Sequence, residues 1–146
     1  TENALNATRA AIEEGVLPGG GVALLRAIPA LEKLEEKLEE DEKTGLRILK
    51  KSLEIPIRLI AENAGFDGAV VVEEVKKNKG AFGFNAQTMK YEDLMASGIV
   101  DPTKVVRSAL ENAASAASMF LITEAVVGEY PEKEEKSKMP SMPEEY

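Results

Sequence analysis

The stretch TGLRILKKSLEIPIRLIAENA, residues 44–64, decides the fold class of this chain, because its apolar side chains recur at helical spacing. One stripe consists of Leu46, Leu49, Leu53, Ile57, Ile60 and Ala64. A helix with such a stripe packs that face against a core. Pro56 should bend this helix, since proline removes a backbone N–H from the helix interior, and Gly65 can supply the left-handed residue that ends many helices. The pattern predicts a mainly α fold.

Upstream of this stretch the sequence predicts two more helices, joined by a glycine-rich connection. Residues 2–14 are rich in residues that favour helices, and Gly15 ends the run. Residues 16–18 lead into three glycines, and a second helix follows, with Pro29 as a candidate kink. Its apolar positions are Leu24, Leu25, Ile28, Leu31 and Leu34. Residues 32–43 carry seven acids and three lysines, which indicates a solvated helix end or loop.

Downstream of the central stretch the elements become shorter. Residues 67–68 (Asp-Gly) predict a turn, and residues 69–77 predict a short helix. Phenylalanines alternate at residues 82–84 as in a short strand, and a polar helix is predicted over residues 88–96. Residues 99–102 predict a second strand, which we expect to pair with the first as a small β-hairpin.

The last long helix is predicted over residues 103–124. Pro102 suits its start, with Asp101 as the cap. Its sequence is apolar on nearly all sides, which is typical of a buried helix. Residues 125–130 predict a strand, and residues 131–146 form a charged segment with Pro and Met that we expect to be disordered.

Composition excludes several classes of chemistry. The 146 residues include no cysteine and no histidine, which excludes disulfides, thiolate zinc sites, cysteine nucleophiles and Ser-His triads. A metal would have to be a hard ion such as Mg²⁺, held by oxygens and shared with a phosphate. The net charge of −8, without a separate basic cluster, argues against nucleic acid as a partner. No apolar stretch approaches the roughly 20 residues of a membrane span, and no leader marks secretion.

Three features carry a chemical signal, and each also has a purely structural interpretation. Glycines 19–21 at a helix start would let a phosphate or nucleotide edge approach the backbone, although a flexible connection is at least as consistent with them. The preferred interpretation of Asp101 is a helix cap, and the alternative is a polar contact to a ligand. Asn85 is read first as a turn residue and second as a group that contacts a purine edge.

Four segments, taken together and in order, carry a family resemblance. They are ALNATRAAIEEGVLPGGGVALLRAIPAL at 4–31, IAENAG at 60–65, FGFNA at 82–86 and YEDLMASGIVDPTKVVRSALENAAS at 91–115. They closely resemble group I chaperonins, the GroEL-type sixty-kilodalton proteins, over about residues 2–130. The glycine triplet followed much later by the GIVDPTKV segment is the most specific part of the match.

This resemblance implies a domain organisation. Residues 1–14 resemble the end of an intermediate-domain helix that swings over bound nucleotide, and Gly15 falls at the hinge. Residues 15–130 resemble the C-terminal half of the equatorial ATP-binding domain, a multi-helical unit with a small β-hairpin and a C-terminal edge strand. Residues 131–146 form an acidic tail without the Gly-Gly-Met repeats of the family. The start at Thr1, already followed by helix, indicates a cut through a longer polypeptide.

The resemblance also assigns site residues. Gly19 and Gly20 match backbone contacts to the nucleotide, Asn85 and Ala86 match the adenine-side pocket, Asp101 matches the acid that contacts the ribose, Ile60 and Ile99 match apolar walls of the base pocket, and Gln87 replaces a small residue. Asn3 stands where the family has an aspartate that promotes attack of water on the γ-phosphate. Arg58 and Asp67 match contacts between rings, and residues 125–129 match a strand that pairs with the neighbouring subunit.

The resemblance implies a partial subunit of an ATP-dependent protein-folding chaperone, which would use ATP or ADP with Mg²⁺. Its partners would be other subunits in a homo-oligomeric ring. Unfolded clients and a co-chaperonin would bind through domains outside this chain, as would the main phosphate loop. The location would be the bacterial cytoplasm or an organellar matrix. Two alternatives stay open: a helical binding or assembly module without turnover, and a degenerate chaperonin that binds ATP but hydrolyses it poorly.

Overall fold

The structure is a computed structural model that describes residues 2–128, and within this range the chain forms five helices and four short strands. The elements are α1 (Glu2–Glu14), β1 (Val16–Pro18), α2 (Val22–Glu35), α3 (Glu40–Asn63), α4 (Gly68–Lys77), β2 (Phe82–Asn85), β3 (Lys90–Asp93), β4 (Val100–Pro102) and α5 (Thr103–Leu121). The mainly α prediction is confirmed. No helix in the described range is long and apolar enough to cross a bilayer. The tail predicted over residues 131–146 lies outside the described residues.

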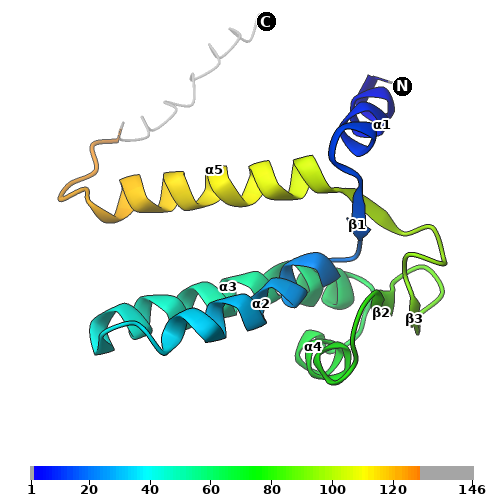
Figure 1. Ribbon diagram of the computed structural model, residues 1–146, viewed down its shortest axis with the longest axis horizontal. Coiled ribbons are helices and arrows are strands. Elements are labelled where there is room, and N and C mark those ends of the chain that lie inside the picture. The colour runs from blue at the N-terminus through cyan, green and yellow to red at the C-terminus, as the bar shows by residue number, and fades with distance from the viewer. Residues whose placement is uncertain (1, 129–146) are drawn as a thin grey trace, which may run out of the picture.

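The core lies between α2, α3, α4 and the β2–β3 hairpin (Figure 1). Its buried side chains are Val22, Leu25, Ile28, Leu53, Ile57, Ala61, Val71, Val72, Val75, Phe84 and Leu94. The predicted stripe on α3 is only partly correct. Leu46, Leu53 and Ile57 are buried, but Leu49 is 39% exposed, and the buried face continues through Ala61. Ile60 is half-buried at the edge of this face.

Helix α3 begins at Glu40, within the acidic segment 32–43, and so begins before the apolar pattern at residues 44–64. Three acids occupy the first turn of α3, at residues 40–42, where the partial positive charge of the helix N-terminus favours them. The carboxylate of Glu42 also accepts a hydrogen bond from the Glu39 N–H at 3.1 Å. The segment therefore provides the end of α2, a turn and the first turn of α3.

The polar helix predicted over residues 88–96 is wrong, because the chain after β2 forms a strand. The chain folds back as β3 and pairs antiparallel with β2, with Phe84 opposite Tyr91. The ring of Tyr91 lies 5.4 Å from Phe84 and 6.1 Å from Phe82, centroid to centroid. Cross-strand aromatic contacts of this kind stabilise a hairpin, and here they override the weak helix preference of the segment.

The second strand does not pair with residues 82–84, so the predicted hairpin partner is wrong. β4 pairs instead with β1, with Val16 opposite Pro102 and Leu17 opposite Asp101. The Thr103 N–H donates to the Gly15 carbonyl at 3.0 Å and extends this pairing. β1 was not evident as a strand in the sequence, because three residues ending in proline give no alternation to detect.

Helix α5 departs from two predictions. Asp101 does not cap it: the residue lies in β4, and the N-cap is Pro102, without a side-chain hydrogen bond. None of the residues of α5 is buried, because among the elements of residues 2–128 it is mainly α1 and β4 that pack closely against the helix (Figure 1). Residues 125–128 do not form the predicted strand, which would need a partner strand to complete its hydrogen bonds.

Candidate functional site

The glycine triplet opens α2 and lies against α3. Gly20 and Gly21 have φ values of 63° and 78°, which residues with side chains rarely adopt. Gly21 is the N-cap of α2, and a Cβ atom on it would lie 2.7 Å from the backbone nitrogen of Ile57. The triplet therefore turns the chain into α2 and lets that helix begin in direct contact with α3.

Three of the predicted site residues meet at this point. The Gly19 N–H donates to the Ile99 carbonyl at 2.9 Å, and a Cβ atom on Gly19 would lie 3.1 Å from Cγ2 of Ile99. A Cβ atom on Gly20 would lie 3.0 Å from Leu94 and 3.7 Å from the carbonyl oxygen of Phe84. The fold thus brings Gly19, Gly20 and Ile99 together beside the strand that ends at Asn85.

Asn85 ends β2 and is only 6% exposed. Its Oδ1 accepts hydrogen bonds from the N–H groups of Gln87, at 2.9 Å, and Thr88, at 3.2 Å. Its Nδ2 donates to Oε1 of Glu92 on β3. The turn interpretation of Asn85 is therefore correct, and the turn fixes which end of the carboxamide is oxygen.

The other pocket residues differ in exposure. Ala86 and Ile99 are partly buried and pack against the core, whereas Gln87 is exposed. Ile60 is half-buried on α3, one turn after Ile57, which contacts the glycine triplet. Asp101, in β4, lines a groove and leaves its carboxylate free of any capping bond.

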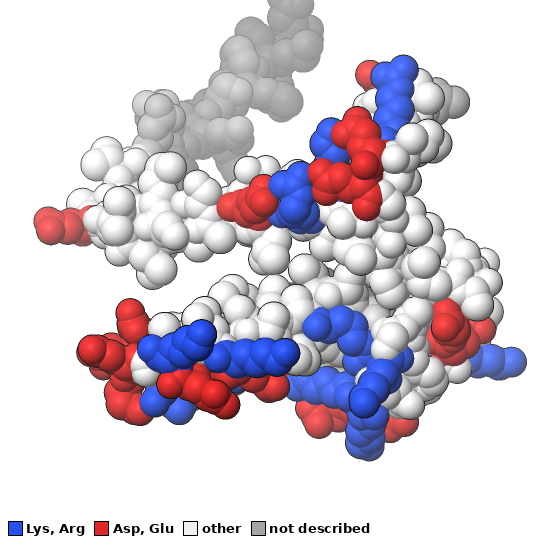
Figure 2. Space-filling view, viewed as in Figure 1, with Lys and Arg blue, Asp and Glu red and all other residues white. Residues whose placement is uncertain are grey.

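That groove runs between α5 and the layer formed by α2 and α3, with a volume of about 520 Å³. Apart from Asp101 and Ser52, its lining is apolar or proline: Leu24, Leu53, Pro56, Pro102, Val105, Val106, Ala109, Leu110 and Ala113. Figure 2 shows the hollow between two layers whose facing surfaces carry few charges. Among the residues that the structure describes, the carboxylate of Asp101 is therefore the one ionisable group in the lining of this groove.

Asn3 does not join the glycine cluster in this structure. It is an exposed residue in the first turn of α1, and α1 leads down to β1 with its N-terminal end farther from α2 and α3 (Figure 1). Asn3 precedes Glu14 by eleven positions of the helix, a rise of roughly 16 Å. Contact between Asn3 and the cluster would therefore require α1 to change its orientation.

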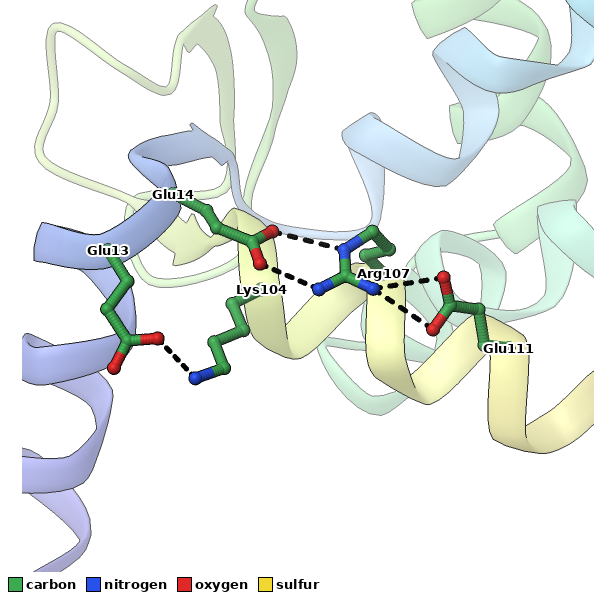
Figure 3. Close-up of polar contacts among 5 residues, drawn as sticks. All are labelled: Glu13, Glu14, Lys104, Arg107 and Glu111. Atoms are coloured by element: carbon green, nitrogen blue, oxygen red, sulfur yellow. Dashed lines mark hydrogen bonds and ion pairs between the residues drawn. The ribbon is translucent and has the colours of Figure 1, made fainter.

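An ion-pair network holds α1 in its present orientation (Figure 3). Lys104 pairs with Glu13, and the guanidinium of Arg107 donates to both carboxylate oxygens of Glu14, at 2.6 and 3.1 Å. Arg107 also pairs with Glu111 one turn further along α5, at 3.0 Å. The Arg107 hydrogen bonds lower the pKa of Glu14, and both carboxylates raise the pKa of Arg107. Charged side chains on the surface therefore connect α1 to α5.

The two residues expected at a ring–ring contact have local roles here. Oδ1 of Asp67 caps α4 by accepting from Ala69 at 2.8 Å and Val70 at 3.2 Å. Nη2 of Arg58 lies 3.8 Å from Oε2 of Glu54, one turn earlier on α3. These contacts account for both residues within one subunit, and a ring–ring role stays a prediction.

Sequence reasoning missed two polar side chains that organise this region. The Arg26 guanidinium donates to the carbonyls of Gly80, Val75 and Phe82, at 2.9 to 3.1 Å, and thereby joins α2 to α4, to the start of β2 and to the loop between them. Burial lowers the pKa of Arg26. Glu92 was missed because the segment around it was predicted as helix. Only the register of a β-hairpin would have placed Glu92 beside Asn85.

The sequence profile described as the TCP-1/cpn60 chaperonin family matches residues 1–131. The chain belongs to this family. Its fold is similar to the crystal structure of a group III chaperonin in the open state, with 35% sequence identity and a TM-score of 0.74. The similarity covers 81% of this chain and 25% of the group III chain. The present chain thus spans about a quarter of the length of that chaperonin.

Chaperonins use nucleotide, and the donor set of this chain fits one side of such a ligand. The Val22 N–H donates to the Gly19 carbonyl at 3.1 Å, but no side chain caps α2, so the N–H groups of Ala23 and Leu24 can meet an anionic or polar ligand. The carboxylate of Asp101 can accept from hydroxyl groups. The described residues do not by themselves form a binding site for Mg²⁺. No group of three or more acidic side chains in residues 2–128 is arranged to hold a metal ion. Phosphate oxygens and groups outside this range would have to complete a Mg²⁺ site.

Proposed function

We propose that this chain is the C-terminal part of a group I chaperonin subunit and supplies the base- and ribose-facing side of its ATP site. The observation that carries the proposal is the meeting of Gly19, Gly20 and Ile99 at the start of α2, beside the hairpin that bears Asn85. The four sequence segments that resemble group I proteins support the finer assignment to that group. Within the subunit, residues 1–14 would belong to the intermediate domain and residues 15–130 to the equatorial domain.

The roles proposed for the residues follow from their chemistry. The backbone at Gly19 and Gly20 would lie against the nucleotide, and Asn85 with Ala86 would contact the adenine. The carboxylate of Asp101 would accept hydrogen bonds from the ribose hydroxyls, while Ile60 and Ile99 would form apolar walls against the base. Gln87 is exposed and would lie at the rim, where its length alters the opening.

α1 would act as a lid on this site. Gly15 joins α1 to β1 with φ at 81°, and nothing lies within 4 Å of the position where its Cβ would be. Rotation at Gly15 would separate Glu13 and Glu14 from Lys104 and Arg107, so lid closure competes with the ion-pair network. Binding and hydrolysis of ATP would shift this balance and move the client-binding domains.

Asn3 would make hydrolysis slow in such a subunit. An aspartate can orient a water or accept its proton, whereas asparagine keeps the shape and loses the charge and basicity. We expect Asn3→Asp to raise the single-turnover rate of the assembled chaperonin by about 100-fold or more, without tighter ATP binding. Equal rates in the two proteins would show that another group carries this role.

A nucleotide titration of the 146-residue chain tests the proposed pocket. ADP should shift the backbone amide NMR signals of Gly19, Gly20, Ala86 and Ile99, and Asp101→Asn should weaken the binding by about 10-fold through loss of a charge-assisted hydrogen bond. A matched control is Glu124→Gln, which removes an exposed carboxylate from the C-terminal side of α5. The proposal fails if ADP shifts none of the four signals, or if Asp101→Asn and Glu124→Gln bind ADP equally well.

The isolated chain should show no Mg²⁺-dependent ATPase above background, because the described residues form no metal site.

The uncovered apolar surface of α5 favours a second candidate function, assembly without turnover. Val105 is 50% exposed, Phe120 68% and Leu121 82%, so α5 presents exposed apolar side chains near both of its ends to another polypeptide. In a ring this polypeptide would be the rest of the subunit or a neighbouring subunit. Measurable ADP binding at the glycine cluster favours the first function over this one.

A further inference from the structure

Glu92 and Asn85 are diagonal neighbours on one face of the β2–β3 hairpin. The register sets Asn85 opposite Lys90 and Gly83 opposite Glu92. Because alternate residues of a strand share a face, all four lie on the same side of the hairpin. The carboxylate of Glu92 reaches diagonally across this face to Asn85, and its Oε1 accepts a hydrogen bond from Nδ2 of Asn85.

This face of the hairpin is directed toward the start of α2. A Cβ atom on Gly83 would lie 2.5 Å from Cγ2 of Val22, the first residue of α2, and 2.6 Å from Cδ1 of Leu94. Leu94 is also the side chain closest to Gly20. The Asn85–Glu92 pair therefore belongs to the same cluster as the glycine triplet and does not lie on a remote surface.

The hydrogen bonds of Asn85 leave it only one free position. A carboxamide offers two acceptor positions on its oxygen and two donor hydrogens on its nitrogen. The N–H groups of Gln87 and Thr88 occupy both acceptor positions, and Glu92 takes one hydrogen. The position that remains is an N–H. A ligand group that reaches the carboxamide of Asn85, which is 6% exposed, must therefore be a hydrogen-bond acceptor and not a donor.

We propose that Glu92 is a positioning residue, which holds the carboxamide of Asn85 so that its remaining N–H meets a ring-nitrogen acceptor on the adenine base. The inference rests on the proposed ATP site and adds two details to it. One is a further residue, Glu92, and the other is the direction of one hydrogen bond, which Asn85 donates to the base. Without Glu92 the turn still holds Oδ1, but the amino group loses the acceptor that keeps its plane in place. The effect of Glu92 should therefore appear in the recognition of the base more than in the folding of the hairpin.

The test compares adenosine with its 1-deaza, 3-deaza and 7-deaza analogues, each of which replaces one ring acceptor by C–H. Binding to the 146-residue chain is followed through its backbone amide NMR signals. One of the three analogues should bind about 3- to 10-fold more weakly than adenosine, the worth of one neutral hydrogen bond. In Glu92→Ala that difference should fall below about 2-fold, and Glu92→Gln, which keeps an acceptor oxygen, should restore part of it. Glu124→Ala, which removes an exposed carboxylate beyond α5, should leave the difference unchanged.

The outcomes separate this inference from the proposed function. Absence of adenosine binding to the unaltered chain would overturn the base pocket and the role of Glu92 together. Adenosine binding with the same loss for one analogue in Glu92→Ala would overturn only the role of Glu92. An equal weakening of adenosine and all three analogues in Glu92→Ala would show a purely structural role and overturn the inference. Selective loss of the discrimination, with the amide spectrum of the hairpin otherwise unchanged, would support it.

Discussion

Two regions of this chain are held together by different forces. The body, made of α2, α3, α4 and the β2–β3 hairpin, buries eleven apolar side chains in one core. The arm, made of α1, β1, β4 and α5, contains two helices without a single buried residue. The arm is instead held by a two-stranded pairing and by exposed ion pairs such as Glu14 with Arg107. Apolar composition is therefore not what separates the regions, because α5 is as rich in apolar residues as the helices of the body.

The difference bears on how the parts would work. A close-packed core resists deformation, since each side chain has one arrangement that fills the space. Exposed ion pairs contribute little to stability and can be broken and remade at low cost. The packing of the body thus favours a rigid role. The weak contacts of the arm favour a role in which it moves or binds another polypeptide.

The largest effect should come from a cavity in the body. Ile57→Ala removes a side chain that is 1% exposed and should lower the free energy of unfolding by about 3–4 kcal/mol. Val105→Ala on α5, where the side chain is 50% exposed, should change it by less than about 1 kcal/mol. Urea denaturation followed by circular dichroism measures both. Similar losses for the two variants would mean that the arm is as tightly packed as the body.

A pair of matched glycines should give the next largest difference. Gly21 and Gly15 both have φ near 80°, so alanine is strained at either position by about 1–2 kcal/mol. At Gly21 the added methyl would also lie 2.7 Å from the backbone of Ile57, whereas nothing lies within 4 Å at Gly15. Gly21→Ala should therefore cost about 3 kcal/mol or more, and Gly15→Ala about 1–2 kcal/mol. Equal costs would show that packing against α3 does not constrain the triplet.

The exposed end of α5 should make the chain self-associate. Phe120 and Leu121 are 68% and 82% exposed, and apolar patches of this kind drive association. Replacing both by serine should reduce the mass measured by light scattering and the binding of a hydrophobic dye. Leu59→Ser, at a 50% exposed leucine of the body, is the matched control and should change neither. A monomer that binds no dye before any substitution would contradict this expectation.

The smallest effect on global stability should come from the ion-pair network. Arg107→Ala should leave the denaturation midpoint nearly unchanged, because the pairs are solvent-exposed. It should, however, accelerate hydrogen exchange in α1 relative to α3. Since Arg107 lowers the pKa of Glu14 below its usual 4.5, this stabilisation is present above pH 4.5 and is lost as the pH falls through the lowered value. The protection of α1 amides, which is the exchange rate relative to the intrinsic rate at the same pH, should fall below pH 4.5 in the unaltered chain but not in Arg107→Ala.

Several features could be predicted from the sequence because they depend on residues close together in the chain. The positions of α1, α2, α3 and α4 follow from helix-forming runs, apolar spacing and glycine stops within a few turns. The turn at Asn85 follows from a side chain that bonds to the backbone two and three residues ahead. The candidate site residues came from a family resemblance, and the structure places Gly19 in contact with Ile99 and Gly20 beside Leu94.

Only the tertiary structure decided which distant segments meet. β4 pairs with β1 and not with β2, since pairing depends on which strand edges are free once the helices have packed. Asp101 appeared to be a helix cap and lies in a strand, and α5 appeared to be buried and is exposed. Local sequence records the preference of a segment for helix or strand. It does not record which surface will cover that segment, because this is a property of all the packed elements together.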